Sequence, residues 1–384
     1  MNLILTIYFV LYGLMHCYVY LKAKRAFDFS IKTSISLAII MILMIFAPVI
    51  VRISENAGYE VFAGFAAYAG YTWMAVLSLF FCFSLLIDFY RLSVYLAGGI
   101  FKKNFLPILN TPKYHFLLPL IFSVSAVVYG YYEAGRIQTE HLIIKTNKMP
   151  KEIQKLKIVQ ISDLHLGLIV GKKRLVKITD KIKIINPDML VSTGDIVDGQ
   201  INHLDELILP LKNIKPVYGK FAVTGNHEFY AGIEISIDFM KKAGFVVLRG
   251  ESIVAGGIIN IAGVDDISSR QKNDGLPETL VLSNIKNSLF TILLKHKPVI
   301  NPMSLELFDL QLSGHTHKGQ IFPFNFVTKL VFPMQNGFFK LSDTSSLYVS
   351  RGSGTWGPPI RLFSPPEITV IELVNLSNSR GEPR

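Results

Sequence analysis

The distribution of apolar and polar positions divides this chain of 384 residues near residue 132. Before that point lie four long apolar stretches without Lys, Arg, Asp or Glu: Met1–Leu21, Ser34–Val51, Phe62–Ile87 and Tyr114–Tyr132. A helix that crosses a bilayer needs roughly 17–25 apolar residues, so the pattern predicts four transmembrane helices. The second stretch has only 18 residues, and a re-entrant or interfacial segment is the alternative for it.

Charges in the connecting segments predict the orientation of these helices. The first stretch lacks the basic start and the cleavage site of a signal peptide, so we expect it to be retained. The second loop is poor in basic residues, whereas the first contains Lys22, Lys24, Arg25 and Lys32 and the third contains Arg91, Lys102, Lys103 and Lys113. The positive-inside rule therefore predicts cytoplasmic first and third loops. With four spans, everything after Tyr132 lies on the extracytoplasmic side of the cell membrane.

The remainder of the chain has the pattern of a globular α/β domain. Residues 137–150 alternate and predict an edge strand or linker. Strands at 157–162, 188–193 and 216–224 alternate with helices at 175–185 and 203–212, which favours a largely parallel sheet. Shorter strands then follow at 245–248, 253–255, 258–264, 289–294 and 310–312, and they predict a second sheet packed on the first. The predicted organisation is a transmembrane region (1–132), a linker with a leading strand (133–156), the α/β domain (157–375) and a polar tail (376–384).

Composition narrows the function without identifying it. The net charge is +11, but residues 137–384 hold 29 basic against 23 acidic residues and no long basic run. This excess is too weak to predict nucleic-acid binding, although it favours anionic or phosphorylated partners. Both cysteines, Cys17 and Cys82, lie in apolar stretches. The α/β domain therefore has no disulfide, no cysteine-based zinc site and no cysteine nucleophile.

Residue types that bind metals follow the ends of the predicted strands. They occur in five segments: Asp163-Leu164-His165, Gly194-Asp195-Ile196-Val197-Asp198, Gly225-Asn226-His227-Glu228, Leu294-Lys295-His296 and Gly314-His315-Thr316-His317. The carboxyl ends of parallel strands meet at one edge of a sheet, so we expect these segments to gather there. Carboxylates and neutral imidazoles around a bridging aspartate are the ligands of a two-metal hydrolytic centre.

In this order the five segments resemble the D-x-H, G-D-x-x-D, G-N-H-[ED], H and G-H-x-H pattern of the calcineurin-like metallophosphoesterase family. The resemblance covers Asp163 to His317, and residues 348–354 and 365–368 are similar to its membrane-attached branch. It implies that the four-helix transmembrane region predicted above is followed by a two-sheet αββα sandwich. It also implies two divalent metal ions bridged by Asp195. One ion would be bound by Asp163, His165, Asp195 and His317, and the other by Asp195, Asn226, His296 and His315.

The resemblance also implies roles for residues that bind no metal. His227 would protonate the leaving oxygen while Asp198 orients its ring, and a supporting structural role is the alternative for His227. Glu228 is expected to hold its own loop. Arg351 is a candidate contact for a substrate phosphate, or else an ordinary salt-bridged arginine. Lys318 stands where many relatives have a small residue, which leaves the choice of substrate open.

The expected function is hydrolysis of phosphate esters at the membrane. Mn²⁺ is the first choice of metal because of its availability and the softness of the ligands. Fe and Zn²⁺ are the alternatives, because a mixed nitrogen and oxygen ligand set does not discriminate among the three ions. A metal-bridging hydroxide would attack the phosphorus of a monoester or diester, and a lipid or envelope-related substrate is one option. The alternatives are a pyrophosphatase of a nucleotide-linked lipid precursor and a non-catalytic membrane protein that binds a phosphorylated ligand. The complete set of ligand types argues against the last of these.

Overall fold

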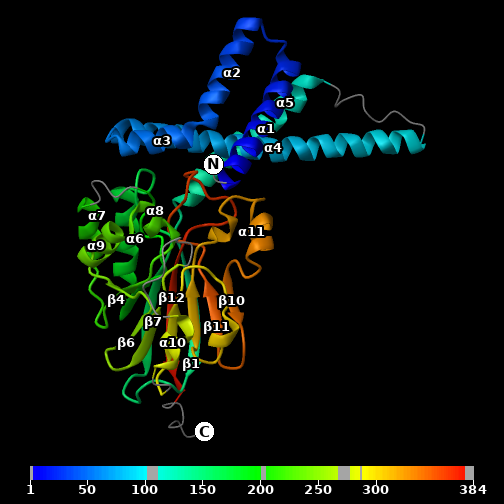
Figure 1. The fold of residues 1–384 in the computed structure, drawn as a ribbon. Helices are drawn as coiled ribbons and strands as arrows, with labels where there is room; N and C mark the ends of the chain where they lie inside the picture. Colours follow the sequence, from blue (N-terminus) through cyan, green and yellow to red (C-terminus); the bar gives the residue numbers. More distant parts are fainter. Residues whose placement is uncertain (1–2, 102–110, 200–204, 267–276, 286–287, 377–384) are drawn as a thin grey trace. The chain divides into compact units, whose positions relative to one another are not determined.

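The computed structural model describes residues 3–101, 111–199, 205–266, 277–285 and 288–376. The chain forms two compact units (Figure 1). The first comprises Met1–Tyr132 and the short segment Gly357–Ile360, and the second comprises the rest. Each unit is described by itself. The predicted loop residues Lys102 and Lys103, the start of the predicted helix at 203–212 and tail residues 377–384 lie outside the described residues.

The first unit is helical, as its apolar stretches predict. It contains α1 (Leu3–Phe27), α2 (Ile31–Ile45), α3 (Ala47–Asn56), α4 (Glu60–Phe101) and α5 (Pro112–Ala134). Three of these helices, α1, α4 and α5, are long and apolar enough to cross a membrane. The stretch that was expected to form the second span is instead bent by 55° between α2 and α3. The break lies at Phe46, just before Pro48 in the first turn of α3, where a proline starts a helix more easily than it continues one.

Contacts within the first unit give the relative direction of α1 and α4. The indole Nε1 of Trp73 donates to Nε2 of His16 at 3.0 Å, and further along both helices Lys22 donates to Asp88 at 2.9 Å. Later residues of α1 thus contact later residues of α4, and α4 lies steeply across α1 (Figure 1). A crossing of the membrane by α2 and α3 as one broken span stays a prediction.

The second unit contains two mixed six-stranded sheets. In spatial order the first comprises β1 (Gln138–Thr146), β12 (Glu367–Asn375), β2 (Lys155–Ile161), β3 (Met189–Ser192), β4 (Lys220–Ala222) and β5 (Val246–Val247). The second comprises β10 (Gly337–Lys340), β11 (Ser346–Val349), β9 (Leu310–Ser313), β8 (Thr291–Leu294), β7 (Ile259–Gly263) and β6 (Glu251–Ala255). One buried apolar cluster joins them, with Val191 and Phe221 from the first sheet and Ile261 and Ile292 from the second. The predicted α/β domain with two packed sheets is confirmed.

Helices cover the first sheet on its outer side, where Figure 1 shows α6, α7 and α9. The predicted spacing in α6 (Lys172–Ile185) is correct, because Leu175, Ile178 and Ile182 are all fully buried. Residues 245–248 were expected to form a strand of the second sheet. That prediction is wrong, because β5 pairs with β4 in the first sheet. The reason is that α8 (Asn226–Ala231) and α9 (Ile233–Lys242), which were not predicted, form a crossover from β4 to a parallel neighbour. The remaining helices are α7 (Asp205–Lys212), α10 (Glu278–Ser283), α11 (Asn325–Val331), η1 (Pro302–Ser304) and η2 (His317–Gly319).

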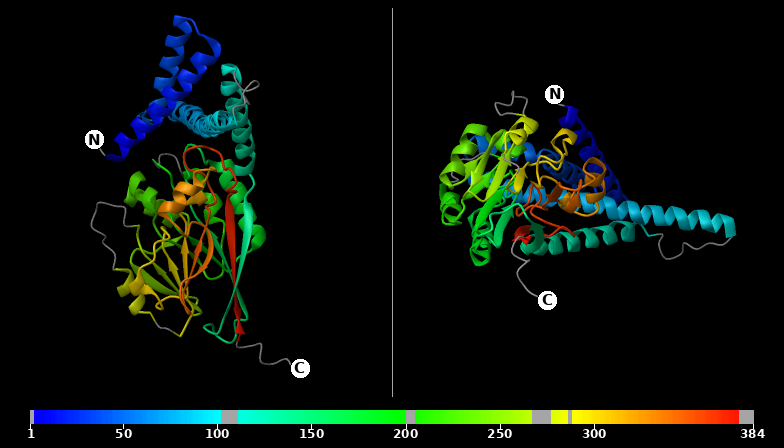
Figure 2. Two further views of the ribbon diagram at one scale, coloured as in Figure 1. Left: turned by 90° about the vertical axis from the view of Figure 1, so that its right-hand side faces the viewer. Right: turned by 90° about the horizontal axis from the view of Figure 1, so that it is seen from below.

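The leading strand β1 enters the first sheet at a defined edge. It runs parallel to β12, with Gln138 opposite Glu367, and Figure 2 shows the two strands side by side. In turn β12 is antiparallel to β2, with Thr369 opposite Gln160. The start of β1 therefore lies at the edge where β2 ends. Helix α5 ends at Ala134, four residues before Gln138, and an extended chain of that length spans roughly 14 Å.

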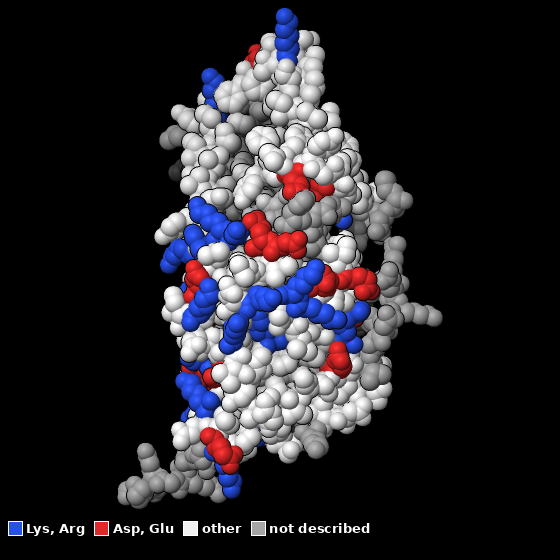
Figure 3. Space-filling model, turned by 90° about the vertical axis from the view of Figure 1, so that its left-hand side faces the viewer, with Lys and Arg blue, Asp and Glu red and all other residues white. Residues whose placement is uncertain are grey.

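The face that carries α6, α7 and α9 has mixed charge. Lys and Arg side chains form a band across it, and Asp and Glu side chains interrupt that band (Figure 3). Exposed ion pairs join several of them, such as Lys172 with Glu206 at 3.2 Å and Lys183 with Asp180 at 3.1 Å. Balanced charges of this kind are typical of a solvated helical face, whereas a nucleic-acid-binding face is predominantly positive.

Candidate metal centre

The carboxyl ends of five strands position the candidate ligands. Within the first sheet β2, β3 and β4 are parallel neighbours, and Asp163, Asp195 and Asn226 follow their ends. Within the second sheet β8 and β9 are parallel neighbours, and His296 and His315 follow their ends. Parallel neighbours end at a common edge. The centre therefore lies where the carboxyl edges of the two packed sheets meet.

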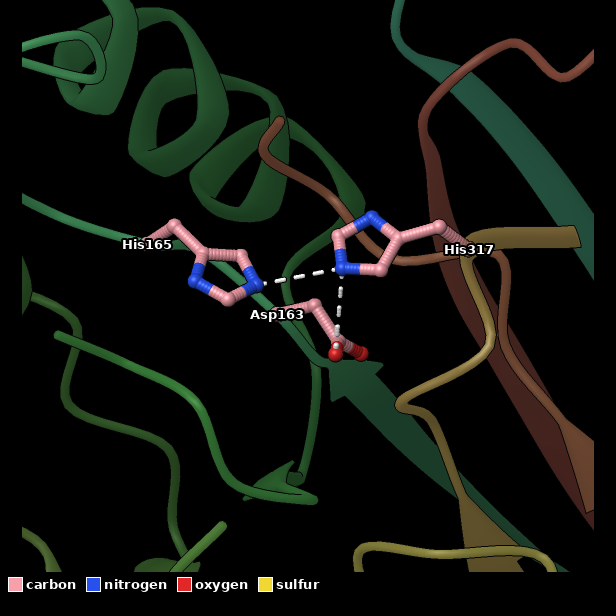
Figure 4. A group of neighbouring side chains, drawn as sticks. All are labelled: Asp163, His165 and His317. Carbon is pink, nitrogen blue, oxygen red and sulfur yellow. Dashed lines mark hydrogen bonds and ion pairs between the residues drawn. The ribbon is translucent and has the colours of Figure 1, made fainter. Parts of the chain in front are cut away.

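One group of side chains brings together residues that lie 152 positions apart in the chain. Figure 4 shows Asp163, His165 and His317 turned toward one another. The Nε2 atoms of the two histidines are 3.1 Å apart. Nε2 of His317 is also 3.4 Å from Oδ1 of Asp163. All three side chains are buried, so these atoms face one another with little access to solvent.

A second group adjoins the first through Asp195. Its Oδ2 is 3.1 Å from Nε2 of His296, which is itself 3.1 Å from Nδ1 of His315. The same oxygen lies 3.8 Å from Nε2 of His165 in the first group. Asp195 thus lies between the two groups, and a further set of candidate ligand atoms joins it to His165 and His227. Its bridging of two metal ions stays a prediction.

These donor atoms fit divalent cations. Within each of the two groups they all lie within 4.8 Å of one another. Ligand atoms at about 2.0–2.2 Å from one ion lie roughly 3–4 Å apart, and the distances above are in that range. Oδ1 of Asn226 is buried and makes no hydrogen bond with any described residue, so it is available as a further ligand. All seven predicted metal ligands lie at this edge of the unit, and their binding of metal stays a prediction.

The backbone at the ligands is unusual. Five of them have a positive φ: Asp163 (51°), His165 (49°), Asp195 (51°), His315 (72°) and His317 (48°). A non-glycine residue adopts this left-handed conformation at a cost, and such residues concentrate at functional sites. The surrounding contacts must therefore hold these turns in place. In each case the turn directs a side chain back toward the centre.

The buried carboxylates and imidazoles shift one another's protonation. Burial works against charge on His296, but Asp195 and Asp163 outweigh it and raise the pKa of His296 to about 10. Burial also opposes charge on Asp195, yet the surrounding histidines hold its pKa well below the ordinary value. Burial and the neighbouring His296 lower the pKa of His315 to about 3. His315 is thus neutral at physiological pH, the form in which imidazole binds metals, whereas His296 would have to release its proton when it binds a metal.

His227 lies beside the metal-binding groups and is held by Asp198. Its Nδ1 is 2.6 Å from the carbonyl oxygen and 3.2 Å from Oδ1 of Asp198. Burial opposes the charged form, but Asp195 and Asp198 raise the pKa of His227 to about 9. The ring is therefore predominantly an imidazolium near neutral pH, with Nδ1 anchored by Asp198.

Glu228 fixes the loops on either side, as expected from the sequence. Its carboxylate accepts from the backbone amides of Gly225, Asp195, Ile196 and Val197 at 2.6–3.2 Å. The side chain is fully buried. The loop that presents Asn226 and His227 is thus tied directly to the loop that presents Asp195.

Two arginines lie close to the centre, and Arg351 forms the salt bridges that were the alternative for it. Arg351 places its guanidinium against Glu140 and against Glu367, whose Oε2 is 2.6 Å from Nε. Its predicted contact with a substrate phosphate stays a prediction. Arg361, which was not singled out from the sequence, is fully buried, and its Nη2 lies 2.9 Å from Nδ1 of His317. A charged residue in the apolar run Ile360–Phe363 was the one available signal.

Comparisons with known proteins agree with this geometry. The model of the calcineurin-like phosphoesterase family matches residues 156–319. An uncharacterized metallophosphoesterase of Aquifex aeolicus is 38% identical over 262 residues, which are 67% of this chain and all of the relative. One of Helicobacter pylori is 35% identical over 302 residues, or 77% of this chain and 79% of the relative. A Danio rerio transmembrane protein with metallophosphoesterase domain is 32% identical over 271 residues, or 67% of this chain and 62% of the relative.

Proposed function

We propose that this chain, which belongs to the calcineurin-like metallophosphoesterase family, is a membrane-attached hydrolase that binds two divalent metal ions and cleaves phosphate esters of lipids. The observation that carries the proposal is the position of Asp195, whose carboxylate adjoins both groups of candidate ligands. Asp163, His165 and His317 would complete one metal site. Asn226, His296 and His315 would complete the other.

When bound, such a metal pair supplies Lewis-acid polarisation of the phosphate and lowers the pKa of water. The side chains determine where this chemistry takes place. Asp195 fixes the spacing of the two sites, and Glu228 keeps its loop in register with the loop of Asn226. Mn²⁺ is the ion to test first, because oxygen and imidazole ligands suit it.

His227 is the proposed general acid. Asp198 anchors Nδ1 and favours the imidazolium, so Nε2 carries a proton that can pass to the leaving oxygen. This residue, together with the complete ligand set, supports a hydrolase rather than a non-catalytic phosphate-binding protein. A general acid would be dispensable if the protein only bound its ligand.

A lipid substrate is proposed because of the path of the chain. The edge of the first sheet that carries Asp163 is also the edge at which β1 begins. Only three residues separate β1 from α5, a helix apolar enough to cross a membrane. The candidate centre is therefore tethered close to the bilayer, where phosphate esters of lipids are concentrated.

The test is hydrolysis of a chromogenic phosphate diester and the matching monoester by the full chain with added Mn²⁺. Asp195→Asn should abolish turnover, because it removes the shared carboxylate. His227→Ala should slow turnover by about 10²–10⁴-fold, the usual contribution of a general acid, and most for esters with poor leaving groups. Asp180→Asn and His141→Ala are matched controls, since both residues are exposed on the second unit.

The outcome distinguishes the proposals. Metal-dependent turnover that is lost in Asp195→Asn and kept in Asp180→Asn supports the hydrolase. If the wild type binds metal but cleaves neither ester nor any lipid phosphate, the non-catalytic alternative replaces it. The ratio of diester to monoester turnover then identifies the class of lipid phosphate to examine.

A further inference from the structure

An apolar surface on α11 is left uncovered within the described residues. We define the α11 surface as Phe322, Phe326, Val327, Leu330 and Val331. Their side chains are 40–84% exposed, with Leu330 the most exposed at 84%. Not one residue of α11 itself is buried. Isolated exposed apolar residues are common, but five in one short segment mark a surface that contacts something apolar.

The α11 surface adjoins the candidate metal centre. The first turn of α11 packs on Gly319, where an added Cβ would lie 2.4 Å from Cα of Asn325. Just beyond the helix, the ring of Phe332 contacts the ring of His315, with centroids 5.2 Å apart. Thr316 also donates to the carbonyl of Gln335. The segment that presents His315 and His317 thus supports both ends of the helix.

The path of the chain indicates what this surface contacts. The centre lies at the sheet edge where β1 begins, four residues after α5 ends. Helix α11 packs on the segment that carries His315 and His317. The short connection between α5 and β1 therefore limits how far α11 can lie from the membrane helix. Its exposed side chains are aliphatic or phenyl, and Lys329 on the same helix is exposed. Apolar side chains beside a lysine are typical of a short helix that lies in the bilayer interface.

We propose that the α11 surface enters the apolar part of the bilayer next to the metal centre. This inference rests on the proposed function, because it assigns the surface to a centre that acts on phosphate esters of membrane lipids. A lipid at this position keeps its acyl chains in the membrane while its phosphate approaches His315 and His317. A binding site for a partner protein is the competing explanation.

The test measures whether the α11 surface contacts lipid in the full chain. Cys17 and Cys82 are replaced by serine, and a single cysteine is introduced by Leu330→Cys or by Ile184→Cys. Ile184 is the matched control, since it is also 84% exposed, but it lies at the end of α6, on the opposite edge of the first sheet. An environment-sensitive fluorophore is attached, and the protein is reconstituted into vesicles of phosphatidylcholine and phosphatidylglycerol, with or without nitroxide-labelled phosphatidylcholine.

We expect the nitroxide lipid to reduce the fluorescence at position 330 at least twofold and to leave position 184 unchanged. Equal fluorescence at position 330 with and without the nitroxide overturns the proposal and favours a protein partner. Equal quenching at both positions overturns it as well, because the contact would not be specific to α11. The measurement needs no turnover, so hydrolysis of the soluble esters by the same samples reports on the proposed function separately.

Discussion

Arg361 places a guanidinium in the interior of the second unit, where an uncompensated charge is costly. Its nitrogens donate to the carbonyl oxygens of Arg351 at 2.8 Å, Gly354 at 2.7 Å and His317 at 3.2 Å. Burial and the neighbouring Arg174 lower its pKa to about 9, which leaves it charged at neutral pH. Arg361 therefore ties the segment between β11 and β12 to the turn that presents His317.

Replacing Arg361 with methionine should destabilise the protein while preserving much of the side-chain volume. The loss removes the guanidinium donor from the carbonyl groups of Arg351 and Gly354, and each unsatisfied buried group costs about 1–3 kcal/mol. We expect the free energy of unfolding to fall by roughly 3 kcal/mol or more, together with a lower metal content. Thermal unfolding of the purified variant measures the first effect. Lys183→Met, which removes an exposed cation, should change stability by less than about 1 kcal/mol, and a similar loss in both variants would contradict the assigned role.

The sequence indicates the residue types of the candidate centre but not how they are held. The order of Asp163, Asp195 and the later histidines is visible as short motifs, because metal ligands must follow the strands directly. The positive φ of five ligands is invisible in those motifs. The partners of Arg351 and Arg361 also escape notice, since they depend on which distant segments the fold brings together.

Among the elements, the loop after β4 shows how closely the two ligand-bearing loops are packed. An added Cβ at Gly225 would lie 2.1 Å from Oδ1 and 2.7 Å from the backbone nitrogen of Asp195. Its φ of −104° is ordinary, so the requirement for glycine is purely one of space. The glycine allows the strand ends to approach until Asp195 and Asn226 are neighbours.

Gly225→Ala should therefore displace the shared carboxylate without unfolding the unit. A displacement of about 1 Å in a catalytic group can reduce the rate by about 10²-fold, and we expect a loss of that order in ester hydrolysis, with fewer metal ions bound per chain. Gly171→Ala is the matched control, because the position before α6 has an ordinary φ and open space around it. Normal metal content and turnover in Gly225→Ala would show that the two loops are not tightly coupled.

Elements with a strong local pattern were predicted well. The strands that became β2, β3 and β4 and the helix α6 carry clear periodicity, and the structure contains them within a few residues. Two short helices, α8 and α9, were missed because α8 begins inside the Asn226 motif itself. Sheet membership was predicted less well, since the pattern of β5 does not reveal which neighbour it pairs with. The place of β1 beside β12 depends on a segment more than 200 residues away.

For the whole molecule, the orientation in the membrane depends on whether α2 and α3 together cross it. Three helices are long and apolar enough to cross by themselves, and the bent pair would be the fourth span. The basic residues of the first and third loops favour a crossing by the bent pair. Four spans would place the second unit outside the cytoplasm, which stays a prediction.

Cysteine accessibility in intact cells tests this orientation. In a chain with Cys17 and Cys82 replaced by serine, a cysteine at Met303, which is 80% exposed in the second unit, should react with a membrane-impermeant maleimide. A cysteine at Lys24, at the exposed end of α1, should react only after the cells are permeabilised. Protection of both positions in intact cells would mean that the bent pair does not cross and that the centre faces the cytoplasm. The reverse pattern would mean that four spans cross in the opposite orientation, which also places the centre in the cytoplasm. Nucleotide-linked lipid precursors are found there, so that result would favour the pyrophosphatase over an esterase acting on the outer surface.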